Sequence, residues 1–243
     1  MPKKVFVTGA TRGIGKAIAT MFSQKSDYEI YITGRNKELL NEVFNEIGAK
    51  GFFVADLANK ADLENLKIEL SKIEPDILVN NAGEYIYGGI EKMGYEEILH
   101  IFETNLIAPV NLISATVESM KRKKWGRIVN IGSISGVMGE AYASLYSGSK
   151  SGLIGMTKAL ALEVASDNIT VNTINPGWVE TELGMESVEE SEFSLEETVE
   201  TIPQKRFVQV EEVAGMVEYL CGEKAKGVTG QSINLCAGLS VGY

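Results

Sequence analysis

The side chains best suited to acid–base chemistry in this chain are a tyrosine and a lysine, because the sequence contains a single histidine, His100. In the stretch YASLYSGSK, Tyr146 and Lys150 are four residues apart and would lie on one face of a helix. A cation about 4 Å from the phenol is worth roughly 4 kcal/mol at an effective dielectric near 20, enough to bring the tyrosine pKa toward neutrality. We therefore expect Tyr146 to transfer the proton. Tyr142 lacks this pairing, since it is eight residues from Lys150 and precedes the predicted helix.

Two further polar residues occupy positions that require partners. Ser133 ends a predicted strand, RIVNIGS, and Asn105 lies in an apolar helical segment, ETNLIAPV. Buried hydroxyls and amides are nearly always hydrogen-bonded, and an active-site network with Tyr146 and Lys150 would satisfy both. The alternative is an ordinary tyrosine–lysine pair on a helix surface.

A glycine-rich turn near the N-terminus predicts a phosphate-binding site. The segment KVFVTGATRGIGKAIATMF reads as a strand, a turn containing Gly9, Gly13 and Gly15, and an amphipathic helix. Glycines allow a tight turn and close approach of a phosphate, and the helix N-terminus offers free N–H groups to an anion. We expect this turn to bind a dinucleotide.

The residues after the second predicted strand favour NADP over NAD. The strand YEIYIT is followed by Gly34, Arg35 and Asn36, with no carboxylate to bind a ribose 2′-hydroxyl. Arg35, with Arg12 in the glycine turn, can pair with a 2′-phosphate. The alternative is that both arginines are ordinary surface residues.

Other strand ends supply small or polar residues. Asp56 and Leu57 follow the third strand, where an adenine would lie, and the fourth strand ends in Asn80 and the segment 81–83. Amides and small residues there suit a crevice at the carboxyl ends of parallel strands. For Asn80, a structural role tying neighbouring strands is an equally good interpretation.

These segments alternate short Val/Ile-rich runs with helical patterns over 243 residues, which predicts an α/β fold. We expect a single domain with a doubly wound parallel sheet of about seven strands and helices on both faces. The net charge of −10 argues against binding nucleic acid or an anionic membrane. No signal segment or 18-residue apolar span is evident, so we expect a cytoplasmic protein. Cys221 and Cys236 lack zinc-site spacing and should be reduced core thiols, with no metal site.

In combination, these motifs resemble the short-chain dehydrogenase/reductases, in their compact single-domain branch. The matching positions are Thr8-Gly9-x-x-x-Gly13-x-Gly15, Asn80-Asn81-Ala82-Gly83, Asn105, Ser133, Tyr146-x-x-x-Lys150 and Pro176-Gly177. The resemblance covers essentially the whole chain and implies one Rossmann-type NAD(P)-binding domain over residues 1–243.

The resemblance also implies roles for individual residues. Ser133 would position a carbonyl oxygen, Tyr146 would deliver the proton, Lys150 would lower the Tyr146 pKa and hold the cofactor ribose, and Asn105 would support a proton relay through water. The implied cofactor-binding set is Gly9, Thr11, Arg12, Gly13, Ile14, Gly15, Arg35, Asp56, Leu57, Asn81, Ala82, Gly83, Tyr146, Lys150, Pro176, Gly177, Val179 and Thr181.

The acidic segment 181–203 is expected to form a lid over the substrate, the alternative being a solvated helical surface. Within the family, the chain is most similar to 3-oxoacyl-[acyl-carrier-protein] reductases of fatty acid synthesis and to aromatic polyketide ketoreductases, and its last residues, GQSINLCAGLSVGY, look more like the latter. The expected pocket is apolar and would accept an acyl substrate. Its expected residues are Ser133, Tyr146, Tyr85, Tyr87, Met138, Tyr142, Trp178 and Met185.

The predicted reaction is NADPH-dependent reduction of a ketone, with a 3-oxoacyl thioester favoured over another small ketone or alcohol such as a sugar, steroid or diketone. A non-catalytic dinucleotide sensor is the alternative from another class. Delivery by an acidic carrier protein stays open, because the basic run 121–124 also suits a helix C-terminus and Asp167 stands where carrier-dependent relatives tend to be basic. The resemblance further implies a homotetramer or homodimer paired through the helices near 95–121 and 145–166.

Overall fold

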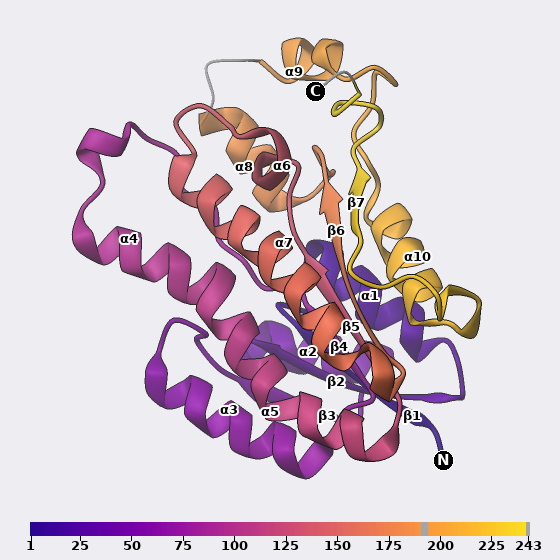
Figure 1. The fold of residues 1–243 in the computed structure, drawn as a ribbon. Helices are drawn as coiled ribbons and strands as arrows, with labels where there is room; N and C mark the ends of the chain where they lie inside the picture. Colours follow the sequence, from indigo (N-terminus) through magenta and orange to yellow (C-terminus); the bar gives the residue numbers. More distant parts are fainter. Residues whose placement is uncertain (191–193, 242–243) are drawn as a thin grey trace.

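Seven parallel strands form one sheet in the order β3-β2-β1-β4-β5-β6-β7, as seen in the computed structural model (Figure 1). The structure describes residues 1–190 and 194–241, and for residues 189–190 only the backbone. The sheet confirms the predicted doubly wound α/β class. The strands are β1 (Lys3–Thr8), β2 (Tyr28–Gly34), β3 (Gly51–Val54), β4 (Ile77–Asn80), β5 (Gly126–Ile131), β6 (Ile169–Pro176) and β7 (Ser232–Leu235).

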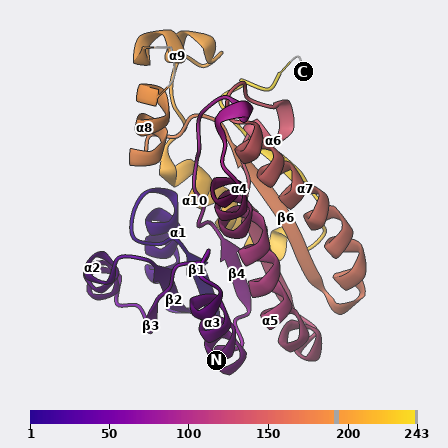
Figure 2. The same ribbon diagram turned by 90° about the vertical axis from the view of Figure 1, so that its left-hand side faces the viewer.

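Helices cover both faces of this sheet and bury two separate apolar clusters (Figure 2). On one face lie α1 (Gly13–Ser23), α2 (Lys37–Ile47) and α10 (Val210–Cys221). On the other lie α3 (Lys60–Ile73), α5 (Ala108–Lys123) and α7 (Ser144–Val164). Because both faces are covered, β4, β5 and β6 are buried along their whole lengths, as expected for parallel strands. Cys221 and Cys236 are buried free thiols, as predicted.

The central strands are also joined by a polar chain. Strand pairing sets Asn80 opposite Asn130, and the Asn80 side-chain amide donates to the Asn130 Oδ1 at 2.8 Å. The Asn130 amide in turn donates to the Thr157 hydroxyl on α7, also at 2.8 Å. These bonds support the structural interpretation of Asn80, which holds the ends of two strands and a helix in register.

A long helical run on one face is interrupted by a π-helical turn. It consists of α4 (Tyr95–Phe102), the π turn η2 (Glu103–Ile107) and α5. The run 95–123 is long and apolar enough to cross a membrane, so the expectation of no 18-residue apolar span was wrong. Here the run packs against α3, α7 and the sheet as a core helix. The π turn contains Asn105, and such turns are frequent at functional sites.

The remaining helices are short. Some lie at the carboxyl ends of the strands, and others form connections elsewhere. The segment predicted as a lid forms two of them, α8 (Glu182–Glu190) and α9 (Leu195–Thr201), and its residues 191–193 lie outside the described residues. The others are η1 (Ile90–Lys92), α6 (Ser135–Met138), η3 (Ala165–Asp167) and η4 (Glu223–Ala225).

Candidate active site

A cavity of about 680 Å³ lies at the carboxyl ends of the strands, where the order of the sheet reverses between β1 and β4. It brings together residues that are far apart in the sequence, from the glycine turn, the strand ends, α7 and α8. The predicted residues on its wall are Gly9, Thr11, Arg12, Gly13, Ile14, Arg35, Asp56, Leu57, Asn81, Ala82, Gly83, Tyr85, Tyr87, Ser133, Met138, Tyr142, Tyr146, Lys150, Pro176, Gly177, Trp178, Val179 and Thr181.

Three predicted residues lie behind this wall. Gly15 packs against the glycine turn, where a Cβ would stand 2.2 Å from the Gly9 carbonyl oxygen, so its role is close helix–strand packing rather than direct contact. Asn105 is buried in the π turn. The expectation for Met185 was wrong, because this side chain packs against a small apolar cluster that includes Val188 and Phe207.

The glycine turn has the shape of an anion cradle. Gly9 and Gly13 have φ values of 65° and 53°, a region that favours glycine, and a Cβ on Gly9 would approach the Ala82 Cα to 2.9 Å. Within the described residues, the Arg12 side chain leaves the N-terminus of α1 uncapped, and residues 13–16 include no acid. Free N–H groups and the helix dipole therefore face the cavity, which fits the pyrophosphate of a dinucleotide.

Asn81 ties this turn to the end of β4. Its side-chain amide donates to the carbonyl oxygens of Thr8 (2.9 Å) and Gly9 (3.1 Å). In return the Thr8 hydroxyl accepts the backbone N–H groups of Asn81 and Ala82, each at 2.9 Å. These reciprocal bonds fix the glycine turn relative to the next strand across the switch point.

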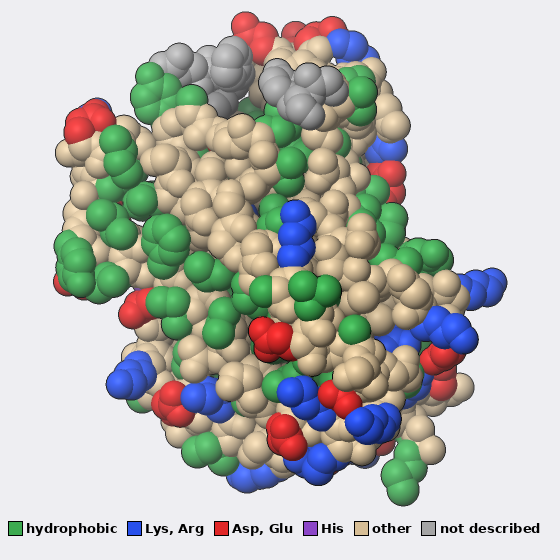
Figure 3. Space-filling view, in the orientation of Figure 1, with side chains coloured by type: hydrophobic (Ala, Val, Ile, Leu, Met, Phe, Trp, Pro, Cys, Tyr) green, Lys and Arg blue, Asp and Glu red, His purple; other side chains and the backbone are tan. Residues whose placement is uncertain are grey.

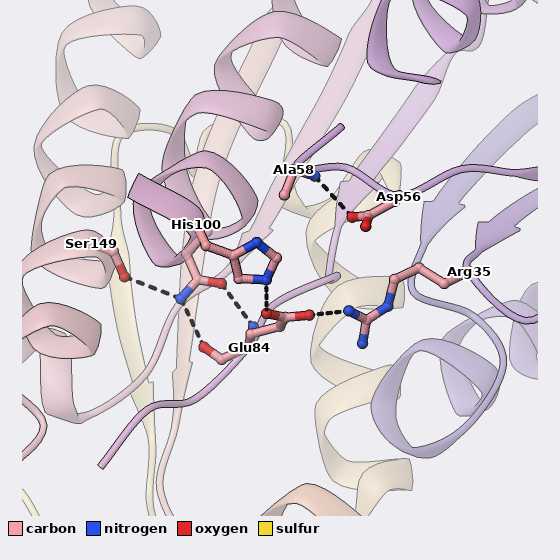
Figure 4. A network of polar contacts seen from close by, with 7 residues as sticks. Arg35, Asp56, Ala58, Glu84, His100 and Ser149 are labelled. Carbon is pink, nitrogen blue, oxygen red and sulfur yellow. Dashed lines mark hydrogen bonds and ion pairs between the residues drawn. The ribbon is translucent and has the colours of Figure 1, made fainter. Parts of the chain in front are cut away.

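Both predicted phosphate-binding arginines have acidic partners that sequence reasoning missed. Arg12 forms an ion pair with Glu182 at the start of α8, and Arg35 forms one with Glu84 (Figure 4). The expectation of two cations without a nearby carboxylate holds for the end of β2 but is wrong for the folded site. Glu84 directly follows the Asn80–Gly83 motif, a position that could have identified it.

Tyr146 and Lys150 lie one turn apart on α7, but their electrostatics differ from the prediction. Burial raises the pKa of Tyr146 to about 12, against the lowering effect of a hydrogen bond with Ser133, and the charge of Glu140 raises it further. Burial also lowers the pKa of Lys150 to about 8. The expected shift of Tyr146 toward neutrality is therefore wrong here, because desolvation of the phenolate is the largest effect on its pKa.

The Lys150 ammonium lies beneath the tyrosine ring. Its Nζ is 5.6 Å from the centre of the Tyr146 ring and donates to the carbonyl oxygen of Ile131 at 3.0 Å. A Cβ on Gly83 would stand 3.1 Å from the Lys150 Nζ and 3.2 Å from the Asn105 Oδ1. A glycine at position 83 thus lets the strand end pass between these two side chains.

Asn105 is fully engaged with protein groups. Its Nδ2 donates to the Glu84 carbonyl oxygen at 2.8 Å and to the Ser149 Oγ at 3.2 Å, and its Oδ1 accepts the Glu84 N–H at 2.8 Å. The side chain therefore clamps the segment after β4 onto α7. This is a positioning role beside the predicted part in a proton relay, which stays a prediction.

A second polar chain runs from Ser133 to a carboxylate. Tyr85 and Ser135 each donate a hydroxyl proton to Glu140, both at 2.6 Å. A carboxylate only accepts, so the Ser135 proton is committed and Ser135 can only accept the Ser133 hydroxyl at 3.1 Å. Glu140 thereby sets the direction of the whole chain, and sequence reasoning did not identify it.

Four tyrosines form a continuous wall from the α7 end of the cavity to its mouth. The ring of Tyr85 stands edge-on to Tyr146 at 5.1 Å and stacks with Tyr87 at 6.5 Å, and Tyr87 contacts Tyr142 at 5.6 Å. Tyr142 is 55% exposed and has a φ of 63°. It is thus part of the wall, as predicted, and is separated from Tyr146 by the two rings of Tyr85 and Tyr87.

The site therefore combines a dinucleotide cradle with the Tyr146 phenol, a buried ammonium and a buried hydroxyl in one cavity. Such a site can bind a nicotinamide dinucleotide beside a group that donates or accepts a proton, the arrangement needed for hydride transfer to a carbonyl.

Comparison with known proteins identifies the family. A family model described as enoyl-(acyl carrier protein) reductase matches residues 9–240. The chain is 37% identical to a 3-oxoacyl-[acyl-carrier-protein] reductase of Buchnera aphidicola subsp. Schizaphis graminum, covering 98% of this chain and 97% of that protein. It is 38% identical to the granaticin polyketide synthase putative ketoacyl reductase 1 of Streptomyces violaceoruber, covering 96% and 91%.

Solved structures agree with these relatives. An actinorhodin polyketide ketoreductase with NADPH has a TM-score of 0.92 and 35% identity, covering 99% of this chain and 98% of that one. YwfH, an NADPH-dependent reductase involved in bacilysin biosynthesis, has a TM-score of 0.93 and 26% identity over the full length of both chains. The chain belongs to the short-chain dehydrogenase/reductase family and is an NAD(P)-dependent oxidoreductase.

Proposed function

We propose that this protein reduces a ketone to a secondary alcohol with NADPH, and that its substrate is a 3-oxoacyl thioester. The observation that carries the proposal is that the glycine-turn cradle meets Ser133, Tyr146 and Lys150 in one cavity. The 3-oxoacyl reductase and ketoreductase relatives support the reaction. Two similar structures, one described with NADPH and one as an NADPH-dependent reductase, support the cofactor.

The residues of this chain would divide the reaction as follows. A bound nicotinamide supplies the hydride. Ser133 and Tyr146 stabilise the charge that develops on the substrate oxygen. Ser133 donates to Ser135 in this structure, so its hydroxyl must rotate toward the substrate to do so.

Tyr146 then gives up its proton. A pKa of about 12 keeps the phenol protonated at neutral pH, which is the form that donates. The pKa of about 8 leaves Lys150 mostly charged at neutral pH, so the ammonium beneath the ring stabilises the phenolate that remains.

Carrier-protein delivery receives little support from the basic run 121–124. Arg122 pairs with Glu74, Lys123 with Asp76 at 2.8 Å, and Lys124 with Asp167. These internal ion pairs compete with an acidic partner, so we propose that a coenzyme A or other small thioester is accepted without a carrier.

A hydroxyl-bearing ketone is the second candidate substrate. The Glu140 carboxylate lies on the cavity wall and already accepts two hydroxyl protons, so it could accept a third from a polyhydroxylated ligand. Such a substrate would bind at the end of the cavity that contains Tyr85 and Ser135.

A substrate screen tests the proposal. Oxidation of NADPH and of NADH is followed with 3-oxoacyl thioesters on coenzyme A and on acyl carrier protein, and with polyhydroxylated, steroid and diketone compounds. We expect the fastest turnover with NADPH and a 3-oxoacyl coenzyme A. Inertness toward every ketone despite tight NADPH binding would contradict catalysis and favour a dinucleotide sensor, and a preference for NADH would contradict the cofactor assignment.

We also propose that two copies pair through α5 and α7. Exposed apolar side chains on these helices and the π turn include Ile107, Val110 and Leu162. Figure 3 shows hydrophobic side chains gathered on this face, over α4 and its neighbours. Light scattering should give the mass of a dimer or tetramer, and a monomer would contradict the pairing.

A further inference from the structure

Glu84 contacts two nitrogen-bearing side chains from distant parts of the fold (Figure 4). Its Oε1 forms an ion pair with the Arg35 guanidinium at the end of β2, and its Oε2 lies 2.5 Å from the His100 Nε2 on α4. A carboxylate only accepts, so the hydrogen of this bond belongs to the imidazole. The single histidine of the chain thus donates a hydrogen bond to a carboxylate on the cavity wall.

The backbone of Glu84 is held in place on both sides. Asn105 accepts its N–H and donates to its carbonyl oxygen, each at 2.8 Å, and Asn105 is itself bound to Ser149 on α7. The carboxylate therefore extends from a fixed peptide, and only side-chain rotation can move it away from Arg35 while it keeps its contact with His100.

The pair with Arg35 involves exposed groups that a ligand can reach. The Arg35 side chain is 59% exposed and that of Glu84 is 23% exposed, and both residues lie on the cavity wall. Asp56, the other acid at this end, uses its Oδ1 to accept the N–H of Ala58 at 3.0 Å, away from the arginine (Figure 4). Glu84 is thus the carboxylate that meets any anion approaching Arg35.

A guanidinium binds a carboxylate or a phosphate through the same fork of N–H groups. A phosphate on the adenosine ribose must therefore share or displace Glu84, whereas a free 2′-hydroxyl need not. We propose that Glu84 sets cofactor selectivity by competing with the 2′-phosphate of NADPH for Arg35, and that His100 retains the displaced carboxylate. The inference rests on the proposed function only in placing a nicotinamide dinucleotide in this cavity.

Binding of dinucleotides to the intact protein tests this competition without any ketone. Glu84→Gln should bind NADPH about fivefold more tightly, the scale expected for an exposed ion pair, while its affinity for NADH changes less than about twofold. Glu96→Gln, on the exposed first turn of α4, removes the same charge without touching Arg35 and should leave both affinities unchanged. Weaker NADPH binding by Glu84→Gln would overturn the proposal, since Glu84 would then orient Arg35 for the phosphate.

A double variant and a histidine variant isolate the two partners. In an Arg35→Gln background, Glu84→Gln should no longer improve NADPH binding, and a persisting gain would show that Arg35 is not the contested group. His100→Gln should weaken NADPH about twofold without affecting NADH, since the carboxylate loses its second partner. If the ratio of NADPH to NADH affinity is the same in His100→Gln and wild type, His100 takes no part in cofactor selectivity.

The outcome for the proposed function is read separately from the same titrations. Binding of neither dinucleotide by the wild-type protein would contradict the proposed function itself. Binding of both, with the same NADPH-to-NADH ratio in wild type and Glu84→Gln, would overturn the selectivity role alone.

Discussion

Glu84 and Glu140 are two carboxylates on the wall of one cavity, and each accepts from two side chains. Glu84 serves the Arg35 end, where its partners Arg35 and His100 are partly exposed. Glu140 serves the Tyr146 end, where the chain through Ser135 reaches the buried Ser133. The difference lies in the partners, which are exposed to water around Glu84 and include buried hydroxyls around Glu140.

We expect this difference in exposure to separate effects on cofactor binding from effects on catalysis. At the Arg35 end, an exposed ion pair is worth little, so a ligand phosphate can compete with it. At the Tyr146 end, Glu140 is connected through the buried Ser135 to Ser133, and its charge raises the Tyr146 pKa. We therefore expect changes at the first end to alter which cofactor binds, and changes at the second to alter the rate and its pH dependence.

The largest expected effect is the loss of the proton donor. Tyr146→Phe should lower kcat for ketone reduction by about 10³-fold, because general acid catalysis typically contributes that much, while NADPH affinity changes less than about threefold. Tyr142→Phe is the matched control and should retain most of the rate. Equal turnover in wild type and Tyr146→Phe, measured by NADPH oxidation with circular dichroism to confirm folding, would exclude Tyr146 as the donor.

Lys150 and Arg35 should contribute differently to the free energy of unfolding, because Lys150 is buried and Arg35 is exposed. Lys150 has its pKa lowered to about 8 in the folded protein from 10.5, so its contribution to folding is present above pH 10.5 and is lost as pH falls through 8. The difference in unfolding free energy between wild type and Lys150→Met should therefore change by about 3 kcal/mol across this window, in favour of wild type at high pH.

The corresponding change at the exposed end should be small. Arg35→Gln should alter the free energy of unfolding by less than about 0.5 kcal/mol at any pH between 8 and 10.5. Urea unfolding at a series of pH values measures both variants. A pH-independent difference for Lys150→Met would show that the lysine is not desolvated as the structure indicates.

The smallest expected effect is a shift in the pH profile on neutralising Glu140. Reduction needs protonated Tyr146, so the rate is lost as pH rises through the Tyr146 pKa. The Glu140 charge raises that pKa, so Glu140→Gln should move the alkaline limb of the kcat profile to lower pH. The NADPH-to-NADH ratio should not change, whereas Glu84→Gln should change the ratio and leave the limb in place. If both variants changed the pH profile and the cofactor ratio in the same way, the Arg35 and Tyr146 ends of the cavity would not have separate roles.

The sequence predicted the architecture and most of the cavity wall because these depend on local patterns. Alternating apolar runs defined the strands, and parallel strands bring their carboxyl ends to one edge, so Gly9, Asn81, Ser133 and Pro176 were expected together. The four-residue spacing of Tyr146 and Lys150 likewise follows from helix geometry.

What the sequence could not predict depends on tertiary burial and long-range partners. The Tyr146 pKa was predicted from its neighbour on the helix, but desolvation by the surrounding fold dominates it. Arg35 and Arg12 meet carboxylates 49 and 170 residues away, which no local pattern indicates. The π turn that aims Asn105 at the Glu84 backbone also interrupts an apparently regular helical pattern.

The most direct test of the proposed reaction is transfer of a labelled hydride in a single turnover. The protein is loaded with NADPH deuterated at the transferable position and mixed with a 3-oxoacyl coenzyme A or another ketone that the substrate screen identifies. We predict one deuterium at the new carbinol carbon per NADPH oxidised, in wild type and not in Tyr146→Phe on the same timescale. NADPH that stays bound and unoxidised with every ketone would contradict ketone reduction and identify a dinucleotide-binding protein without this chemistry.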